Sequence, residues 1–354
     1  MKKSFIFSDK MKVNYIFEEK FKLGYYQESS IPFLFLKNSF EENFYYFRRF
    51  KISVTDIHFR SLKSDVGKVK IGIIANSVED MTLGDRIVRD YNLLNKSNCQ
   101  VFIIPMGFDW TLSSQDSVTY QRFVAEYFDL LISLGGDDIH PSLYNQKNLF
   151  AQNVNFERDL SEFNLVKYYK KYSTGVFLGI CRGHQLSAII DGFELIQDLG
   201  EINSECLAKH RKSTNENPEY IYHSVQIYPS LLSRLFGYKN NSTFCVNVNS
   251  YHHQAVKFSE NKDSFCAALD KEHNVIEALV SNNHKSISVQ FHPELPNELN
   301  KNHEFTELGH SFIRRVVAYA RLHKRFKIKT TSDISQTQEV NSRLPSEQKF
   351  RKFK

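Results

Sequence analysis

The hydrophobic positions of the chain change their pattern near residue 68. From there onward, short continuous apolar runs alternate with amphipathic stretches. Continuous apolar runs are typical of strands that are buried on both faces of a parallel sheet, and the amphipathic stretches predict the helices that cover it. Strands are predicted over residues 68–77, 99–107, 130–136 and 176–178, and helices over residues 86–98, 120–129, 157–172 and 184–190.

The second half of the chain is richer in short apolar segments. They predict strands over residues 222–230, 243–250, 265–270, 275–281 and 286–294. The polar stretch 203–220 predicts a loop, and residues 303–325 predict a long closing helix. The expected fold is therefore α/β, with a mostly parallel sheet flanked by helices. In such sheets, ligands bind beyond the carboxyl ends of the strands.

The two ends of the chain differ from this central part. Residues 1–67 are rich in aromatic residues and lysine, with candidate strands at 31–36 and 47–54. We interpret them as an N-terminal extension that packs on a main domain of residues 68–325. Residues 326–354 have blocks of like charge and few apolar residues, which predicts a basic, disordered tail.

Charge is concentrated in that tail. The whole chain has a net charge of +6, but from Arg321 onward there are 10 Lys and Arg against 3 Asp and Glu, which leaves 36 against 37 elsewhere. We therefore expect no nucleic-acid partner for the core domain, whereas the tail is a candidate for contact with anionic surfaces. Of the two, a solvated terminus is the interpretation that we favour.

Cysteine usage and the N-terminus indicate a compartment. The five cysteines show neither C-x-x-C nor a zinc-site spacing, which suits a reducing environment. Asp9 and Lys10 interrupt the first apolar run, so no secretory signal is predicted. No apolar run approaches the roughly 20 residues of a membrane span. We expect a cytoplasmic protein without a metal site.

The stretch TGVFLGICRGHQ, residues 174–185, is the strongest candidate for chemistry. A strand runs into Gly-x-Cys-x-Gly and continues as a helix, which predicts a strained turn that presents Cys181 above the sheet. The helix N-terminus favours a thiolate, and the main-chain N–H of Arg182 is placed to face an oxyanion. The alternative is a buried structural cysteine.

Two further motifs follow predicted strands. In LGGDDIHPSLY, residues 134–144, the glycines let the backbone approach a ligand, and the N–H of Gly136 is a candidate second oxyanion donor. An ordinary turn is the alternative reading. In SVQFHPE, residues 288–294, Glu294 is spaced to orient His292, which would accept the proton of Cys181.

Two other motifs leave their roles open. In VNSYHHQAV, residues 248–256, the side chains of His252 and His253 are expected on opposite faces, which disfavours a shared metal site. A substrate contact and a structural hydrogen bond both remain open for them. In ERDLSEF, residues 157–163, Arg158 and Glu162 are spaced either to pair on one helix face or to position a substrate.

Together these motifs resemble the class I glutamine amidotransferase fold, which is flavodoxin-like. More narrowly, they resemble the γ-glutamyl-γ-aminobutyrate hydrolase family, which stands beside the folate γ-glutamyl hydrolases. With QDL at residues 197–199 as the sixth, six motifs match in order across residues 68–320. The resemblance implies a nucleophile, Cys181, with His292 as base and acid, Glu294 as its partner, and the amides of Gly136 and Arg182 as the oxyanion hole. The substrate contacts it implies are Gly135, Asp137, Gln185, Ser250, His252 and Gln254.

The implied activity is hydrolysis of a small-molecule γ-glutamyl amide without a cofactor. Polyamine-derived, folate-like and peptide substrates all fit this core, and a homo-oligomer is compatible with it. The main alternative is a glutaminase subunit that supplies ammonia to a synthase; a further one is a non-catalytic binding protein. The chain departs from the family pattern at residues 191–194 and at Phe291, where the family commonly has Trp.

Overall fold

The computed structural model describes residues 21–26, 33–36, 57–61, 67–76, 99–106, 114–211, 220–239, 241–259, 263–294, 305 and 307–324. The centre of the fold is a parallel block in the order β5-β4-β6-β7-β14. These strands are β4 (Val69–Ala75), β5 (Cys99–Pro105), β6 (Leu130–Ser133), β7 (Val176–Ile180) and β14 (Ser286–Val289). Within this parallel block, β4 comes first in the chain, β5 is added on one side of it, and β6, β7 and β14 are added on the other. This is the flavodoxin-like order.

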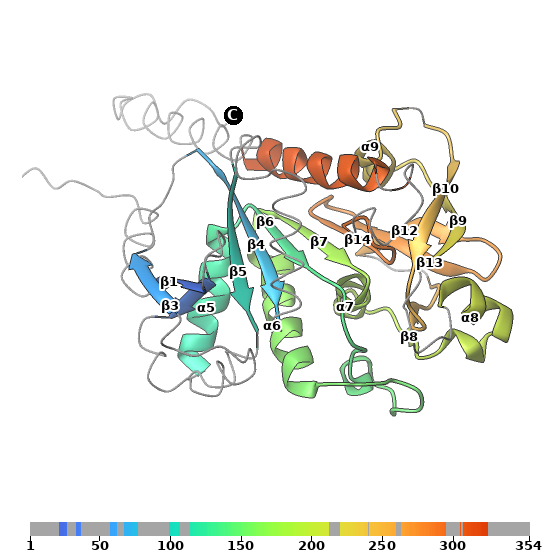
Figure 1. The fold of residues 1–354 in the computed structure, drawn as a ribbon, viewed down its shortest axis with the longest axis horizontal. Coiled ribbons are helices and arrows are strands. Elements are labelled where there is room, and N and C mark those ends of the chain that lie inside the picture. Colours follow the sequence, from blue (N-terminus) through green and yellow to red (C-terminus); the bar gives the residue numbers. More distant parts are fainter. Residues whose placement is uncertain are drawn as a thin grey trace, which may run out of the picture.

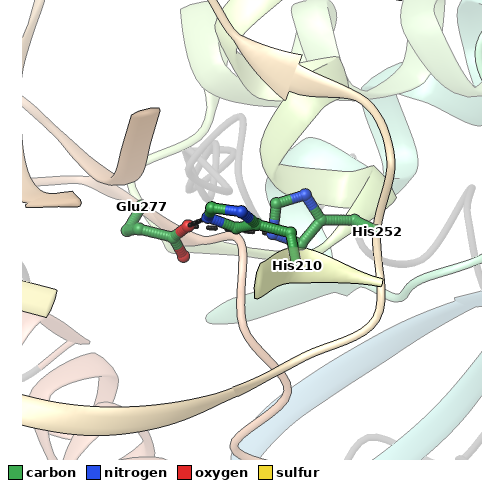
Figure 2. A group of neighbouring side chains, drawn as sticks. All are labelled: His210, His252 and Glu277. Atoms are coloured by element: carbon green, nitrogen blue, oxygen red, sulfur yellow. Dashed lines mark ion pairs between the residues drawn. The ribbon is translucent and has the colours of Figure 1, made fainter. Parts of the chain in front are cut away.

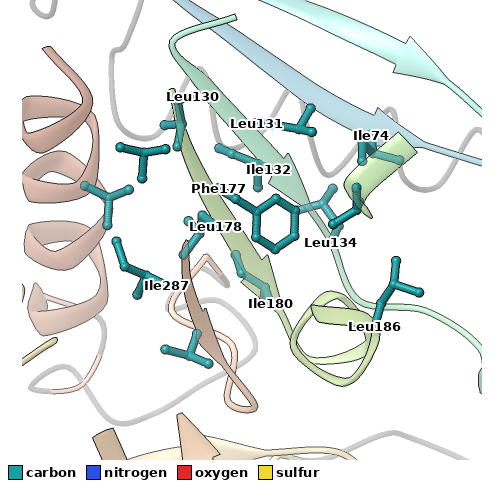
Figure 3. Packing of buried hydrophobic residues seen from close by; sticks show 14 of the residues in the cluster. Ile74, Leu130, Leu131, Ile132, Leu134, Phe177, Leu178, Ile180, Leu186 and Ile287 are labelled. Atoms are coloured by element: carbon teal, nitrogen blue, oxygen red, sulfur yellow. The ribbon is translucent and has the colours of Figure 1, made fainter. Parts of the chain in front are cut away.

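Helices cover both faces of this block. Figure 1 shows α5 (Ser114–Tyr127), α6 (Phe156–Tyr172) and α7 (Arg182–Ile190) on one side of the strands and the helix of residues 307–324 on the other. Every residue of β6, β7 and β14 is buried. Figure 3 shows the resulting core, in which Ile132, Leu178 and Ile287 of three adjacent strands pack together. Burial on both faces is why these strands are continuous apolar runs.

The second half of the chain extends the sheet with antiparallel strands. Beyond β14 come β13 (Val275–Ser281), β12 (Ser264–Asp270), β9 (Ile221–Ile227) and β10 (Phe244–Ser250). A short pair, β8 (Leu195–Ile196) and β11 (Ala255–Val256), joins at β13. Three brief helices, η3 (Pro141–Tyr144), η4 (Leu199–Glu201) and α9 (Leu231–Leu235), lie between these elements.

At the opposite edge, strands from the N-terminal residues continue the sheet. The strand β2 (Phe33–Leu36) pairs in parallel with β5, and β1 (Phe21–Tyr26) and β3 (Ile57–Ser61) follow in antiparallel. The strand predicted within residues 31–36 is therefore present. The predicted strand 47–54, the predicted helix 86–98 and the predicted tail 326–354 lie outside the described residues.

One prediction is wrong. Within the stretch 203–220, which we predicted as a loop, α8 (Ser204–His210) forms a helix. The side chain of Asn203 caps it by accepting a hydrogen bond from the backbone N–H of Cys206. Cys206 and His210 lie four residues apart and are both buried, so one face of this short helix packs inward despite its polar composition.

Strand register decides where the candidate motifs meet. Ser133 of β6 pairs with Gly179 of β7, and Ile180 of β7 pairs with Val289 of β14. The three strands therefore end together, and the residues that follow them lie side by side at one edge. None of the helices in the described part of the chain is both long and apolar enough to cross a membrane.

Candidate active site

Cys181 lies at the junction of β7 and α7 in a strained backbone conformation. Its φ is 52° and its ψ is −106°, a combination that costs a residue with a side chain about 1–3 kcal/mol. The neighbouring glycines permit this turn. A Cβ on Gly179 would lie 2.4 Å from the carbonyl oxygen of Gly183, and one on Gly183 would lie 2.4 Å from that of Ser133. The strained turn predicted from the Gly-x-Cys-x-Gly pattern is thus present.

The structure brings Cys181, His292 and Glu294 together. The His292 Nδ1 atom is 2.8 Å from Glu294 Oε1. Both Cys181 and His292 flank Gly135, because a Cβ there would lie 3.5 Å from Cys181 Cβ and 3.0 Å from His292 Cε1. Burial disfavours the imidazolium, but charge interactions and side-chain hydrogen bonds with Cys181 and Glu294 hold the pKa of His292 well above its usual value. This favours an imidazolium beside the sulfur.

Two residues of this site were missed by the sequence motifs. Asn249 accepts a hydrogen bond from the backbone N–H of His292 at 2.8 Å and donates one to its carbonyl oxygen at 2.9 Å. Gln290 directs its Nε2 atom to Cys181 Sγ at 3.6 Å. The two-residue spacing from Gln290 to His292 was the available signal, because alternate strand residues share a face. Asn249 carries no such signal, since its partner lies 43 residues away.

The ERDLSEF motif anchors the turn of the nucleophile. The buried Arg182 side chain pairs with Asp159 at 2.5 Å and with Glu162. Glu162 also accepts a hydrogen bond from Ser133 Oγ at 2.6 Å, whereas its closest contact with Arg158 is 4.0 Å. Of the two readings left open for this motif, the i, i+4 pair of Arg158 and Glu162 is present at 4.0 Å, but the shorter contacts of Glu162 are with Arg182 and Ser133. Glu162 ties α6 to the start of α7 and to the end of β6.

The two candidate oxyanion donors lie beside the nucleophile. Arg182 is the first residue of α7, and the first N–H groups of a helix have no acceptor within that helix. Gly136 follows β6 with a φ of +152°, and the guanidinium of Arg158 lies so close that a Cβ on Gly136 would be 2.6 Å from its Nη2 atom. A side chain at this position would therefore displace Arg158.

Cys181 and His292 line a pocket of about 250 Å³. Larger pockets of about 480 and 490 Å³ lie elsewhere, but no histidine is among the residues that line either one. The expected substrate contacts mostly reach the small pocket, since Asp137, Gln185, His252 and Gln254 line it. Ser250 does not: it is fully buried, and its hydroxyl donates to the carbonyl oxygen of His210. The other lining residues are Gly136, Asp138, Gln152, Asn153, Arg211, Tyr220, Tyr251 and His253.

The neighbouring histidines turn to different partners. His253 Nε2 is 2.8 Å from Asp138 Oδ2, which ties the pocket wall to the loop after β6. His252 Nδ1 is 2.9 Å from the carbonyl oxygen of Gln254, and burial lowers the pKa of His252 to about 4. This imidazole is therefore neutral near pH 7. The two rings do not share a partner among the described residues, but both line the same pocket, so the predicted placement on opposite faces is wrong. The reason is that β10 ends at Ser250, before the alternation of side chains could apply to them.

Fold and site together define a protein of the class I glutamine amidotransferase-like kind. A model of the Peptidase C26 family matches residues 70–294, and the chain belongs to this family. It is 33% identical over 214 residues to Protein NtpR of Enterococcus hirae, covering 57% of this chain and 85% of that protein. It is 29% identical over 167 residues to a putative glutamine amidotransferase-like protein of Lactococcus lactis, covering 47% of this chain and 66% of that one.

Two solved structures are similar to this chain at low sequence identity. A putative GMP synthase protein of Thermoplasma acidophilum is 16% identical, with a TM-score of 0.48 over 74% of this chain and 99% of that one. The glutaminase domain of Trypanosoma brucei CTPS with bound acivicin is 13% identical, with a TM-score of 0.44 over 72% of this chain and 94% of that one.

Proposed function

We propose that this protein is a cysteine hydrolase that cleaves γ-glutamyl amide bonds of small molecules. The observation that carries the proposal is that Cys181 and His292, from segments far apart in the chain, line one small pocket while the buried Glu294 holds the His292 ring. A nucleophile beside a base that is itself oriented by a carboxylate is the arrangement of covalent acyl-transfer catalysis. Membership of the Peptidase C26 family supports this reaction class.

The reaction follows from the geometry in two stages. The Cys181 sulfur attacks the γ-carbonyl carbon, and the amides of Gly136 and Arg182 stabilise the oxyanion, a contribution of about 3–4 kcal/mol per donor in comparable sites. The His292 imidazolium donates its proton to the departing amine as the C–N bond breaks, which leaves a γ-glutamyl thioester. Neutral His292 then takes a proton from water, which attacks the thioester and releases glutamate and the Cys181 thiol.

The pocket suits a small zwitterionic acyl group. Its volume of about 250 Å³ lies below the roughly 300–1,000 Å³ of pockets for drug-sized ligands. The residues that line it include the positively charged Arg211 and the negatively charged Asp137 and Asp138. A glutamyl group has an α-carboxylate and an α-ammonium, which need one partner of each sign. Arg211 is held beside the ring of Tyr251, with its guanidinium carbon 5.6 Å from the ring centroid.

The test is a hydrolysis screen on the full chain. The panel contains γ-glutamyl amides of monoamines, polyamines and amino acids, with glutamine and the matching α-glutamyl amides included. We expect turnover of γ-glutamyl but not α-glutamyl compounds, and loss of turnover in Cys181→Ala without loss of thermal stability. Cys245→Ala is the control, because Cys245 is exposed and lines a different pocket.

The other outcomes separate the alternatives. Full activity in Cys181→Ala refutes the assigned nucleophile. Turnover of glutamine alone, with ammonia as product, favours a glutaminase subunit, for which the name of the amidotransferase-like relative from Lactococcus lactis is the supporting observation. Binding of the panel compounds without any turnover favours a non-catalytic binding protein.

A further inference from the structure

A second cluster of side chains lies on the far side of His252 from the pocket. His210 ends α8, His223 belongs to β9, His252 follows β10 and Glu277 belongs to β13. The three Nε2 atoms converge on one oxygen, Glu277 Oε1, at 3.5 Å from His210, 3.3 Å from His223 and 3.7 Å from His252. Figure 2 shows the rings of His210 and His252 turned toward the carboxylate of Glu277.

The outer hydrogen bonds of two of these rings fix their orientation. His210 Nδ1 is 2.7 Å from the carbonyl oxygen of Cys206, and His252 Nδ1 is 2.9 Å from that of Gln254. A carbonyl oxygen can only accept, so each Nδ1 atom carries a hydrogen. In the neutral ring, the Nε2 lone pair then faces Glu277. A backbone carbonyl behind Nδ1 is the usual outer support of a histidine that binds a metal through Nε2.

The inner atoms of the cluster are buried without adequate partners. The side chains of His210 and Glu277 are fully buried, and those of His252 and His223 are 3% and 7% exposed. Within the described residues, the Nε2 atoms of all three rings and both oxygens of Glu277 make no hydrogen bond. One proton can join a single imidazole to the carboxylate, but it leaves the other rings unpaired. His210 Nε2 also lies 3.7 Å from Asp270 Oδ2, so two carboxylates face this ring. A metal ion between the rings and Glu277 would satisfy these buried atoms together.

We propose that His210, His252 and Glu277 bind a divalent transition-metal ion, and that this ion is Zn²⁺. The ligand atoms of these three residues all lie within 4.8 Å of one another. A tetrahedral zinc ion with bonds of about 2.0–2.1 Å separates its ligand atoms by about 3.3–3.4 Å, close to the distances that converge on Glu277. Two imidazoles and one carboxylate are three of the four ligands of a tetrahedral zinc site, and His223, 3.3 Å from Glu277 Oε1, is the candidate for the fourth.

The neighbouring group Asp270, Glu272 and His273 does not carry the same inference. His273 Nδ1 is 2.9 Å from Asp270 Oδ2, and Asp270 Oδ1 accepts from the backbone of Glu272, so these atoms already have partners. The side chain of Glu272 is also 59% exposed.

The ion would stabilise one wall of the pocket rather than take part in the reaction. It would join α8, β9, the segment after β10 and β13, which carry or adjoin the pocket residues Arg211, Tyr220 and Tyr251. This inference does not depend on the proposed hydrolase activity. The sequence shows no spacing for it, because these residues come from four separate segments.

The experiment measures metal content on the full chain. Purified protein is stripped with a chelator, reconstituted with Zn²⁺, separated from free ion and measured by plasma mass spectrometry. We expect about one zinc ion per chain in the wild type and less than roughly a tenth of that in Glu277→Gln and His210→Asn. His253→Asn is the matched control, because this adjacent histidine is bound to Asp138 instead and its loss leaves zinc content unchanged.

Two further readouts keep the test decisive. X-ray absorption at the zinc edge should show nitrogen and oxygen ligands only; a sulfur ligand points to Cys206 and overturns the assigned set. Added Zn²⁺ should raise the melting temperature of stripped wild-type protein but not of Glu277→Gln, since only a folded site binds the ion. Wild-type protein that retains no zinc, or equal loss of zinc in His253→Asn, overturns the proposal even if a ligand variant fails to fold.

Discussion

His292 is held on two sides before any substrate arrives. Asn249 binds its backbone N–H and carbonyl oxygen, and Glu294 binds its Nδ1 atom. Tyr220 stands edge-on to its ring with the centroids 5.8 Å apart. These contacts fix the position and orientation of the imidazole, so that its protonation state is what can change. The proton on the ring, rather than a rearrangement of the ring, is therefore the variable that pH controls at this site.

The first residue-scale prediction concerns thiol alkylation. Burial raises the pKa of Cys99 and Cys206 to about 11 and that of Cys266 to about 12, so these thiols stay protonated at neutral and acidic pH. Cys181 lies beside the ring of His292, whose raised pKa places a positive charge next to the sulfur. We expect iodoacetamide at pH 6 to modify Cys181 first, as read by peptide mass spectrometry.

The matched variant is His292→Asn. It removes the imidazolium, so alkylation of Cys181 at pH 6 should slow by roughly tenfold, because the positive charge beside the sulfur is lost. The raised pKa of His292 means that the imidazolium is present at pH 6 and is lost as pH rises through that pKa. The difference between wild type and variant should therefore shrink at alkaline pH. Equal rates at pH 6 would contradict the ion pair.

At the scale of elements, Arg182 joins the helix of the nucleophile to its neighbour. Its guanidinium binds Asp159 and Glu162 of α6, and Glu162 reaches Ser133 at the end of β6. The backbone of the same residue supplies the N–H beside Cys181. A buried ion pair thus fixes a donor that must sit within hydrogen-bond distance of an oxyanion. Disturbing α6 should alter catalysis without touching a reacting atom.

Glu162→Gln tests this link. Breaking a buried ion pair costs about 3–5 kcal/mol, which should appear as reduced free energy of unfolding in urea at pH 7, together with reduced kcat. Burial alone would raise the pKa of Glu162, but Arg182, Arg158 and Ser133 hold it below its usual value. The ionised form therefore stabilises the fold at neutral pH, and this contribution is lost as pH falls through the lowered pKa. The stability gap between wild type and variant should close in acid.

Arg122→Gln is the control for that experiment. Arg122 also forms an i, i+4 pair, with Glu126 at 2.8 Å, but the two side chains are 53% and 41% exposed. Exposed pairs of this kind contribute about 0–1 kcal/mol, so the control should unfold almost like the wild type. If both variants lose the same stability, the buried pair does not have the role assigned to it.

At the scale of the whole molecule, the sequence predicted those strands of the sheet that are buried along their whole length. Apart from Lys70 and Gln100 near their starts, the strands β4, β5 and β7 are apolar runs because both of their faces are covered, and a local pattern is enough to find them. The helix α8 was missed because its inward face rests on two residues, Cys206 and His210, whose surroundings come from distant strands. The two hydrogen bonds from Asn249 to the backbone of His292 were missed for the same reason, because they are tertiary contacts between distant segments.

The basic tail, residues 326–354, remains a prediction of the sequence. If the tail contacts anionic surfaces instead of staying solvated, the full chain will bind vesicles that contain anionic lipid, and residues 1–325 alone will lose that binding while they retain hydrolysis. Raised salt should release the full chain, since exposed charges are screened over about 8 Å at physiological ionic strength. Vesicles of zwitterionic lipid are the control. Equal binding by both forms of the chain would assign the membrane contact elsewhere.

The position of β14 has a consequence for synthesis of this protein on the ribosome. β14 pairs with β7, yet 109 residues separate Cys181 from Gln290. During translation, the apolar strand VFLGI of β7 therefore emerges long before its neighbour and presents unpaired backbone groups. Cys181 is also synthesised before His292. The nascent chain therefore passes through a stage in which an aggregation-prone strand is exposed and the candidate active site is incomplete. Chaperone demand should be greatest during that interval.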